Sequence, residues 1–61
     1  MKYRAQFKGK EGSLGYSRGK LYTLDIWQES RKIIIRSMDN PRGACVYSNL
    51  YTFFDNWSIK D

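Results

Sequence analysis

The chain offers few side chains that could catalyse a reaction or hold a metal ion. Its 61 residues include no histidine and one cysteine, Cys45. A Ser-His or Cys-His nucleophile needs an imidazole base, a structural zinc ion needs about four Cys or His ligands, and a disulfide needs a second cysteine. Each of these sites lacks a required residue, and we expect Cys45 to be a buried, unreactive thiol.

The carboxylates and lysines do not suggest acid–base catalysis either. A lysine could act as a base only after strong desolvation, and so small a domain has little interior. We find no spacing typical of a paired acid and base among Glu11, Asp25, Glu29, Asp39, Asp55 and Asp61. The sequence therefore predicts a protein that is not an enzyme and uses no cofactor and no metal.

Positive charge is concentrated near the N-terminus. The formal net charge is +5 and the isoelectric point is near 9.6. Basic residues on one strand face could contact phosphates of nucleic acid or an acidic partner, although a charged face also serves solubility and discourages edge pairing. The candidate anion-binding or nucleic-acid-binding residues are Lys2, Arg4, Lys8, Lys10, Arg18 and Lys20.

Ten aromatic residues exceed what a small core needs. Exposed Tyr and Trp are typical of protein interfaces and also stack on nucleic-acid bases. The rings expected in the core are Tyr3, Phe7, Tyr22, Phe54 and Trp57. The rings that are harder to bury are Tyr16, Trp27, Tyr47, Tyr51 and Phe53, although a small barrel also uses rings to fill volume. The predicted partner-binding or self-association residues are Trp27, Tyr47, Tyr51 and Tyr16.

Short strands must position these side chains. Strands are predicted at residues 2–8, 20–28, 32–38, 44–48 and 57–60. In the first strand Tyr3, Ala5 and Phe7 face one way and the basic residues face the other, which indicates a half-buried antiparallel strand. Three consecutive isoleucines, Ile33–Ile35, favour burial on both faces at the centre of the third strand.

The connections between the strands differ in kind. Four of the five glycines lie in residues 9–19, so we expect positive φ angles there, with Leu14 and Tyr16 folding back on the barrel. Polar turns are predicted at residues 29–31 and 39–43. A phosphate-binding loop would lead into a helix, whereas Gly19-Lys20 leads into a strand, which favours an ordinary bent loop.

The last connection is predicted to be helical. Ser48 or Asn49 can cap a short helix over residues 50–56, which Asn56 would end in the left-handed region. The order of strands, long loop and helical turn predicts an all-β, five-stranded SH3-like barrel formed by the single domain 1–61. An OB-like barrel is the alternative, but it usually needs a longer chain and a helix between strands three and four.

Targeting signals are not evident in the sequence. The N-terminal segment MKYRAQFKGK has no apolar stretch of the kind found in signal peptides. The aliphatic run Ile33–Ile35 is far shorter than the ~20 residues of a membrane-spanning helix. Together with the single cysteine, these features favour a cytoplasmic location and argue against a membrane partner.

Two resemblances extend this interpretation. The segment Gly43-Ala44-Cys45-Val46-Tyr47-Ser48-Asn49-Leu50-Tyr51 resembles the fourth strand and helical turn of Src homology 3 domains. It implies the fold but not proline-peptide binding, because the first strand lacks an Ala-Leu-Tyr-Asp-Tyr segment, the long loop has no acidic cluster, and no Trp opens the third strand.

The second resemblance covers nearly the whole chain and is to small proteins encoded by phages and prophages. The matching segments are Phe7-Lys8-Gly9, Gly12-Ser13-Leu14-Gly15-Tyr16, Gly19-Lys20-Leu21-Tyr22-Thr23-Leu24, Val46-Tyr47-Ser48-Asn49-Leu50 and Phe54-Asp55-Asn56-Trp57. It implies an accessory protein that binds and disables a host macromolecule or traps a signalling nucleotide.

Three functional hypotheses follow from these features. The first is a non-enzymatic binding module that docks on a host protein, such as a defence protein, and modulates or inhibits it. The second is a nucleic-acid-binding protein that uses the basic residues of the first strand and the long loop. The third is a small homo-oligomer that sequesters an anionic nucleotide between subunits.

Overall fold

Five strands form where the sequence alternates between apolar and polar residues. The computed structural model describes residues 2–40 and 43–60. The strands are β1 (Lys2–Phe7), β2 (Leu21–Glu29), β3 (Lys32–Ser37), β4 (Cys45–Tyr47) and β5 (Trp57–Ile59). Each bound lies within one residue of the predicted one, because the period-two pattern marks where one face of a strand stays in the core.

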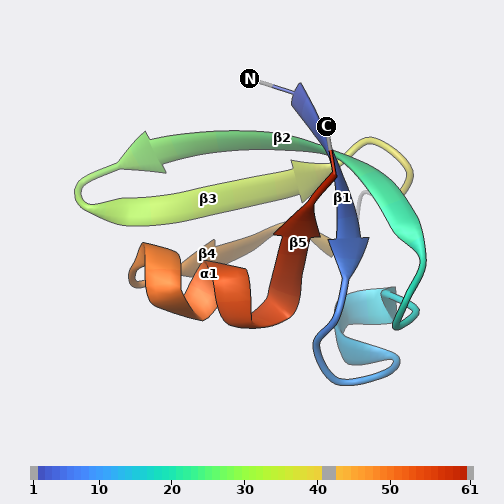
Figure 1. Cartoon of the computed structure of the whole chain (residues 1–61). Coiled ribbons are helices and arrows are strands. Elements are labelled where there is room, and N and C mark those ends of the chain that lie inside the picture. Colours follow the sequence, from blue (N-terminus) through green and yellow to red (C-terminus); the bar gives the residue numbers. More distant parts are fainter. Residues whose placement is uncertain (1, 41–42, 61) are drawn as a thin grey trace.

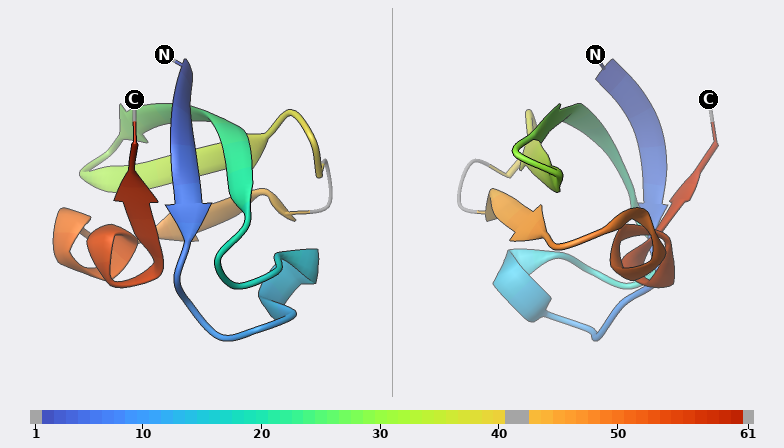
Figure 2. Two further views of the ribbon diagram at one scale, coloured as in Figure 1. Left: turned by 45° about the vertical axis from the view of Figure 1, so that its right-hand side comes forward. Right: turned by 90° about the vertical axis from the view of Figure 1, so that its left-hand side faces the viewer.

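The strands form one antiparallel sheet in the order β4-β3-β2-β1-β5. The sheet curls around its own core (Figure 1 and Figure 2), and helix α1 (Leu50–Asn56) precedes the last strand. The predicted all-β, five-stranded barrel with one helical turn before the last strand is thus confirmed, in the form of a half-barrel.

Helix α1 borders the open side of the half-barrel. Among the described strands, β4 and β5 stand at the two ends of the sheet order and do not pair with each other. Each has only three residues, and α1 links them and contacts both. The gap between the sheet edges is therefore bordered by helical side chains, and not closed by backbone hydrogen bonds.

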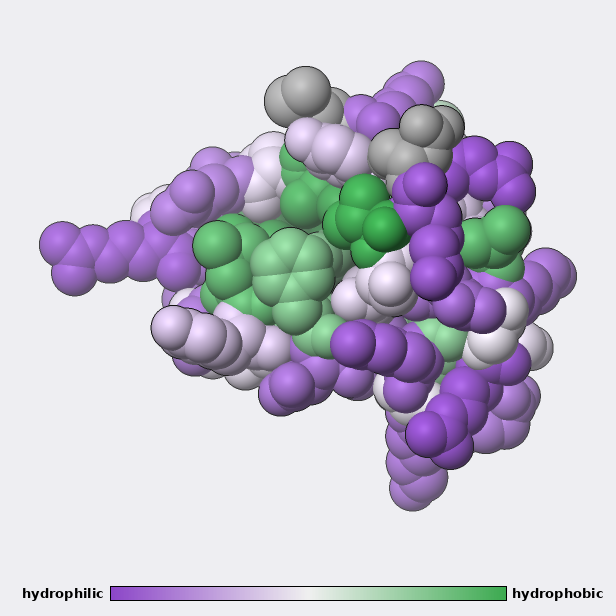
Figure 3. All heavy atoms as spheres, in the orientation of Figure 1, coloured by the Kyte–Doolittle hydropathy of each residue, from purple (hydrophilic) through white to green (hydrophobic). Residues whose placement is uncertain are grey.

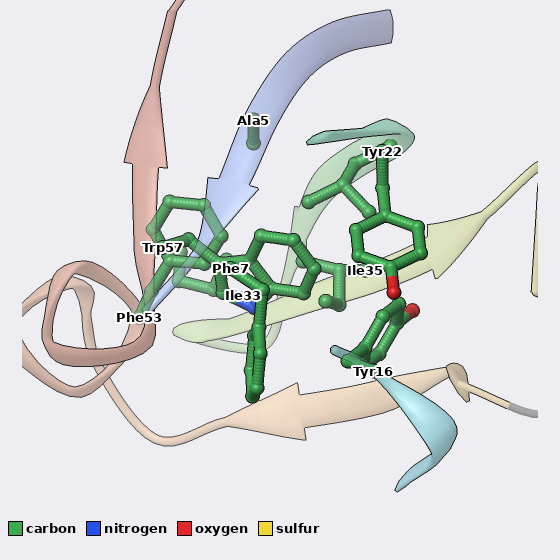
Figure 4. Packing of buried hydrophobic residues seen from close by; sticks show 9 residues of the cluster. Ala5, Phe7, Tyr16, Tyr22, Ile33, Ile35, Phe53 and Trp57 are labelled. Atoms are coloured by element: carbon green, nitrogen blue, oxygen red, sulfur yellow. The ribbon is translucent and has the colours of Figure 1, made fainter. Parts of the chain in front are cut away.

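The core lies on the concave side of the sheet and is rich in aromatic rings (Figure 4). The Tyr16 ring lies 4.8 Å from the rings of Tyr22 and Trp57, edge to face in both pairs. Such pairs are worth about 0.5–1.5 kcal/mol beyond the area they bury. The buried apolar residues are Ala5, Phe7, Tyr16, Tyr22, Leu24, Ile33, Ile35, Phe53 and Trp57.

The Tyr16 ring was expected to be hard to bury. This prediction is wrong, because only 1% of the Tyr16 surface is exposed. Its hydroxyl donates a hydrogen bond to the Gly43 carbonyl at 2.9 Å. A Cβ at position 43 would collide with the Tyr16 ring, so glycine is what lets the ring lie against this backbone.

The glycine-rich connection bends as expected, with φ of 82° at Gly12, just before the short 3-10 helix η1 (Ser13–Gly15), and 83° at Gly15, the last residue of that helix. Tyr16 folds back on the barrel as predicted, and more deeply than expected, but Leu14 does not fold back. Leu14 is 49% exposed and itself has a positive φ of 53°. Only its backbone is anchored, through a carbonyl that accepts a hydrogen bond from Asn40 Nδ2 at 3.0 Å.

Asn49, the second of the two predicted caps, begins α1. Its Oδ1 accepts a hydrogen bond from the Thr52 backbone N–H at 2.9 Å, which satisfies one free donor of the first turn. The helix does not end in a left-handed Asn56 as predicted. The chain passes directly into extended backbone at Trp57, with φ −140° and ψ 143°.

Tight turns join the outer strands. Ser30 and Arg31, between β2 and β3, have φ of 50° and 67°, so both central residues of this hairpin turn are left-handed. The turn between β3 and β4 is held by a Gly43 N–H to Asn40 carbonyl bond of 2.8 Å. Pro41 and Arg42 of the predicted turn lie outside the described residues.

Burial along β3 is less symmetrical than its three isoleucines suggest. Ile33 and Ile35 are buried in the core, whereas Ile34 is only half-buried on the other face. The expected burial on both faces is therefore partial, because no helix or strand among residues 2–40 and 43–60 forms a second layer over the convex side of the curled sheet (Figure 2).

Candidate functional site

An open apolar groove of about 240 Å³ lies where α1 meets the sheet. We call it the α1 groove. Four elements supply its lining, which is Tyr3 of β1, Ile26 of β2, Leu50, Phe53 and Phe54 of α1, and Ile59 of β5. Figure 3 shows hydrophobic side chains gathered at the centre of this face, with hydrophilic side chains around them.

The helical lining residues share one face of α1. Leu50, Phe53 and Phe54 are spaced i, i+3 and i+4, which places them together on the helix surface. Only Phe53 is buried, and its ring lies 5.8 Å from the Tyr47 ring and 5.0 Å from the Phe54 ring. Leu50 and Phe54 remain 54% and 48% exposed, so the helix presents more apolar surface than the core covers.

The predicted assignments of the two neighbouring phenylalanines are therefore reversed. Phe54 was expected in the core and lies in the groove, whereas Phe53 was expected to be hard to bury and is 2% exposed. Exposed apolar side chains that gather in one place mark interaction surfaces. The i, i+3, i+4 spacing of the helical residues is the sequence signal that identifies this face.

The four predicted partner-binding residues do not form one patch. Tyr16 is in the core, and the Tyr47 hydroxyl accepts a hydrogen bond from Trp57 Nε1 at 3.0 Å, which ties the half-buried Tyr47 ring to the core. Trp27 is 37% exposed but lies on the opposite sheet face from its neighbour Ile26. Tyr51, 84% exposed on α1, is the predicted residue nearest in sequence to the groove lining.

Trp27 belongs to a separate apolar row on the convex face of the sheet. The register places it opposite Ile34, which in turn lies opposite Val46. Its indole Nε1 donates to Glu29 Oε2 at 3.2 Å. Val46 is 56% exposed. This row is therefore an exposed apolar surface on the opposite face of the sheet from the groove lining, and substitutions in it can serve as controls for substitutions in the groove.

The six predicted basic residues are all exposed, but they fall into two groups. Lys2, Arg4 and Lys8 alternate with the inward residues of β1 as expected. The other three belong to the long loop and its end. There Arg18 N–H donates to Glu11 Oε1 at 2.7 Å, and Lys20 Nζ lies 5.5 Å from the centre of the Tyr22 ring.

Lys60 is a basic residue that the sequence analysis did not select. Because Ala5 lies opposite Ile59, Lys60 lies opposite Arg4, and its N–H donates to the Arg4 carbonyl at 2.9 Å. Like charges directly opposite each other in a sheet are destabilising. The pairing of β1 with β5 brings these two cations together, and only knowledge of that pairing could have found Lys60.

The groups whose pKa is shifted, Tyr16, Cys45 and Tyr47, do not line the groove. Burial raises the pKa of Tyr16 to about 12 and also raises those of Tyr47 and Cys45. These hydroxyls and the thiol therefore stay protonated at neutral pH. Cys45 is half-buried, less covered than the sequence suggested.

Two further properties concern metal ions and membranes. Among residues 2–40 and 43–60, no three His, Cys, Asp or Glu side chains are grouped so that they could hold a metal ion. Within the same residues, no helix has the length and apolar character needed to cross a bilayer.

No protein-family model, curated protein or solved structure matches this chain.

Proposed function

We propose that the protein is a binding module, and not an enzyme, which acts in the cytoplasm by docking on a host protein through the α1 groove. The single observation that carries this proposal is the groove itself, in which Leu50, Phe54 and Ile59 from two elements remain at least 36% exposed. A domain of this size has little stability to spare for uncovered apolar side chains.

The shape and chemistry of the groove favour a macromolecule over a small ligand. Its volume of about 240 Å³ is below the roughly 300–1,000 Å³ typical of small-molecule sites. Of its six lining residues only Tyr3 carries a polar side-chain atom, whereas a small ligand is usually oriented by several polar groups. Apolar side chains of a partner protein need no such groups.

The resemblance to small phage and prophage proteins supports a host protein as the partner. An accessory protein of this kind inhibits its target by covering a surface that the target needs for its own work. The exposed ring of Tyr51, beside Leu50 on α1, enlarges the surface that such a target would contact, because Tyr buries a large area with few rotamers lost.

Affinity capture with a pair of matched variants tests this proposal. The tagged protein is incubated with nuclease-treated bacterial lysate, in parallel with Phe54→Ser in the groove and Val46→Ser on the convex face. We expect Phe54→Ser to lose the captured protein and Val46→Ser to keep it, with both variants folded by circular dichroism. Equal capture by Phe54→Ser and by the unaltered protein would refute the groove as the docking site.

Binding of nucleic acid is the second candidate, and the Arg4–Lys60 pair is the observation that favours it. These two cations lie opposite each other on the outer face of β1 and β5, on the face that also carries Lys2 and Lys8. Phosphates placed between them would relieve their repulsion. Such binding would weaken steeply with added salt because phosphate contacts release counterions.

A further inference from the structure

We infer that the convex face of the β2–β3 hairpin binds the same face of a second copy of this chain, so that the protein forms a symmetric homodimer. This surface lies on the opposite side of the sheet from the residues that line the α1 groove. The inference therefore goes beyond the proposed function and does not rest on it. It follows from how charged and apolar side chains are arranged on the two strands.

The convex face of the hairpin is acidic along β2 and basic along β3. Residues two apart in a strand point to the same side of the sheet, and Leu24 and Ile35 are buried on the core side. The convex side consists of Asp25, Trp27 and Glu29 of β2 and Lys32, Ile34 and Arg36 of β3. We call it the hairpin face. Its acids and bases balance each other, although the whole chain carries a net charge of +5.

The strand register arranges the hairpin face in three rows. The opposite pairs are Asp25 with Arg36, Trp27 with Ile34, and Glu29 with Lys32. The Arg36 guanidinium lies 3.9 Å from the Asp25 carboxylate. An apolar row is thus flanked on each side by a row that holds one acid and one base, with each acid on β2 and each base on β3.

This pattern is complementary to itself when two copies meet face to face. A two-fold axis that runs along the strands, midway between β2 and β3, places β2 of each copy over β3 of the other. In such an interface, if residue i contacts residue j, then j also contacts i. Asp25 then meets Arg36 of the second copy, and Glu29 meets Lys32. Between these charges, each Trp27 ring covers the Ile34 side chain of the other copy.

The same charges disfavour the other symmetric arrangement. A two-fold axis across the strands would place β2 over β2, so that Asp25 would meet Glu29 of the second copy and Lys32 would meet Arg36. Like charges brought together in an interface repel each other. The hairpin face therefore selects one orientation, and a second copy is the partner that always carries the matching charges in the matching register.

The apolar row supplies affinity, and the curvature of the sheet limits the size of the contact. Trp27 is 37% exposed, and tryptophan is enriched among the residues that dominate binding energy. Because the sheet curls away from this side (Figure 2), β1 and β4 diverge from the contact and Val46 lies outside it. So small an interface is of the weak class, and we expect a dissociation constant between about 1 μM and 1 mM.

The net charge of the chain does not prevent this association. Two molecules of charge +5 repel each other at long range, but physiological salt screens such repulsion beyond about 8 Å. The opposite charges of the hairpin faces come into direct contact, where screening is weaker. A dimer should therefore form in buffers of about 0.15 M salt.

Sedimentation velocity over a range of protein concentrations, with paired charge reversals, tests the inference. Asp25→Lys/Glu29→Lys makes the hairpin face wholly basic, and Lys32→Glu/Arg36→Glu makes it wholly acidic. Each variant alone should associate with itself at least tenfold more weakly, because like charges then meet. An equimolar mixture of the two should associate again as a heterodimer, because every pair across the interface is then opposite in sign.

Reversal of all four charges in one chain guards against loss of folding. Each single-sign variant also places like charges opposite each other within the hairpin, which could destabilise it. The fourfold variant restores opposite charges both within the hairpin and across the interface. It should therefore be folded by circular dichroism and dimerise as the unaltered protein does.

Further variants separate the hairpin face from net charge and from the groove. Lys10→Glu/Arg18→Glu changes the net charge as much as Lys32→Glu/Arg36→Glu does, but in the long loop, and should not weaken self-association. Phe54→Ser, in the groove, should also leave it intact. Trp27→Ser should weaken self-association at least tenfold and should still capture the partner protein from lysate.

The outcomes distinguish this inference from the proposed function. A protein that stays monomeric up to about 1 mM, a fourfold variant that folds but does not dimerise, or self-association that persists in Trp27→Ser would overturn the homodimer and leave the groove proposal standing. Self-association that is lost in Phe54→Ser would also overturn it. Conversely, equal capture of the partner by Phe54→Ser and by the unaltered protein would refute the groove proposal and leave the homodimer intact.

Discussion

Two adjacent phenylalanines show how one residue step separates core from surface. Phe53 is 2% exposed and Phe54 is 48% exposed, although their side chains are identical. The difference arises because successive residues of a helix point about 100° apart. Phe53 therefore packs on Tyr47, and Phe54 faces the groove.

Tyr16 predicts how stability depends on pH. Burial raises its pKa from 10.0 to about 12 in the folded protein, so the unfolded chain releases this proton first as the pH rises. The stability that follows from this difference is complete below pH 10 and is lost as the pH approaches 12. Urea denaturation across this range should show the decline.

A Tyr16→Phe variant is the control for this decline. It removes the titrating hydroxyl, and with it the bond to Gly43, so the variant should be less stable at neutral pH and should lose less of its stability above pH 10. Tyrosinate absorbance that shows all five tyrosines ionising near the ordinary pKa in the folded protein would contradict the burial of Tyr16.

The cap of α1 gives a second prediction at the residue scale. Asn49→Ala removes the side-chain acceptor of the Thr52 N–H and should lower the free energy of unfolding by about 1 kcal/mol. For a domain of this size, the midpoint of thermal unfolding would fall by about 4–8 °C. Ser48→Ala is the control and should change little, and the opposite ranking would mean that Ser48 is the cap.

The hairpin between β2 and β3 holds two consecutive residues in a strained backbone conformation. Both Ser30 and Arg31 are left-handed. This conformation costs most residues roughly 1–2 kcal/mol, whereas glycine adopts it freely and asparagine adopts it more easily than other residues do. Ser30→Asn with Arg31→Gly should therefore raise the free energy of unfolding by about 1 kcal/mol, as measured by chemical denaturation.

Arg31→Ala provides the comparison for this hairpin. It removes the same side chain but keeps a Cβ, so it should give no stabilisation. If the alanine variant stabilised the protein as much as the Asn-Gly pair did, the effect would come from the lost charge and not from the backbone.

Alternation along the strands was enough to predict the elements, but not the groove. Strand bounds and the position of α1 depend on local patterns, and the structure confirms them. The burial of Tyr16 depends on Gly43, 27 positions away, and the Arg4–Lys60 pair depends on how β5 pairs with β1. Such relations between distant segments are not contained in any local pattern.

Helical phase was the other feature that local patterns left open. The apolar residues of α1 show which side chains share a face, but a helix of seven residues can turn that face wholly or partly toward the core. Here its docking between β4 and β5 covers Phe53 and leaves Leu50 and Phe54 uncovered. The groove exists because these two apolar side chains of α1 stay exposed beside the sheet.

At the scale of the whole molecule, the open half-barrel joins two kinds of surface. The gap between β4 and β5 holds α1 and leaves the apolar groove beside it, whereas the outer face of β1 and β5 carries cations. Apolar contact would supply affinity for a protein partner, and the charge would speed the encounter with an acidic one.

Salt dependence separates this account from nucleic-acid binding. The partner captured from lysate should remain bound when salt is raised from about 50 to 200 mM, because apolar contact is little screened, whereas nucleic acid held by several phosphate contacts would be released. The variant Lys2→Glu/Arg4→Glu/Lys8→Glu should slow association but keep the partner. A steep loss of affinity with salt, or full loss of binding in this variant, would favour the nucleic-acid alternative.

Site-specific photocrosslinking tests the central claim most directly. A photoreactive phenylalanine analogue is placed at position 54 in the groove, and in a separate protein at position 46 on the convex face, and each is irradiated in living cells. Our account predicts a covalent adduct with one protein from position 54 that survives nuclease and is missing from position 46. Adducts that form at position 46 and not at position 54, or adducts that contain nucleic acid, would contradict it.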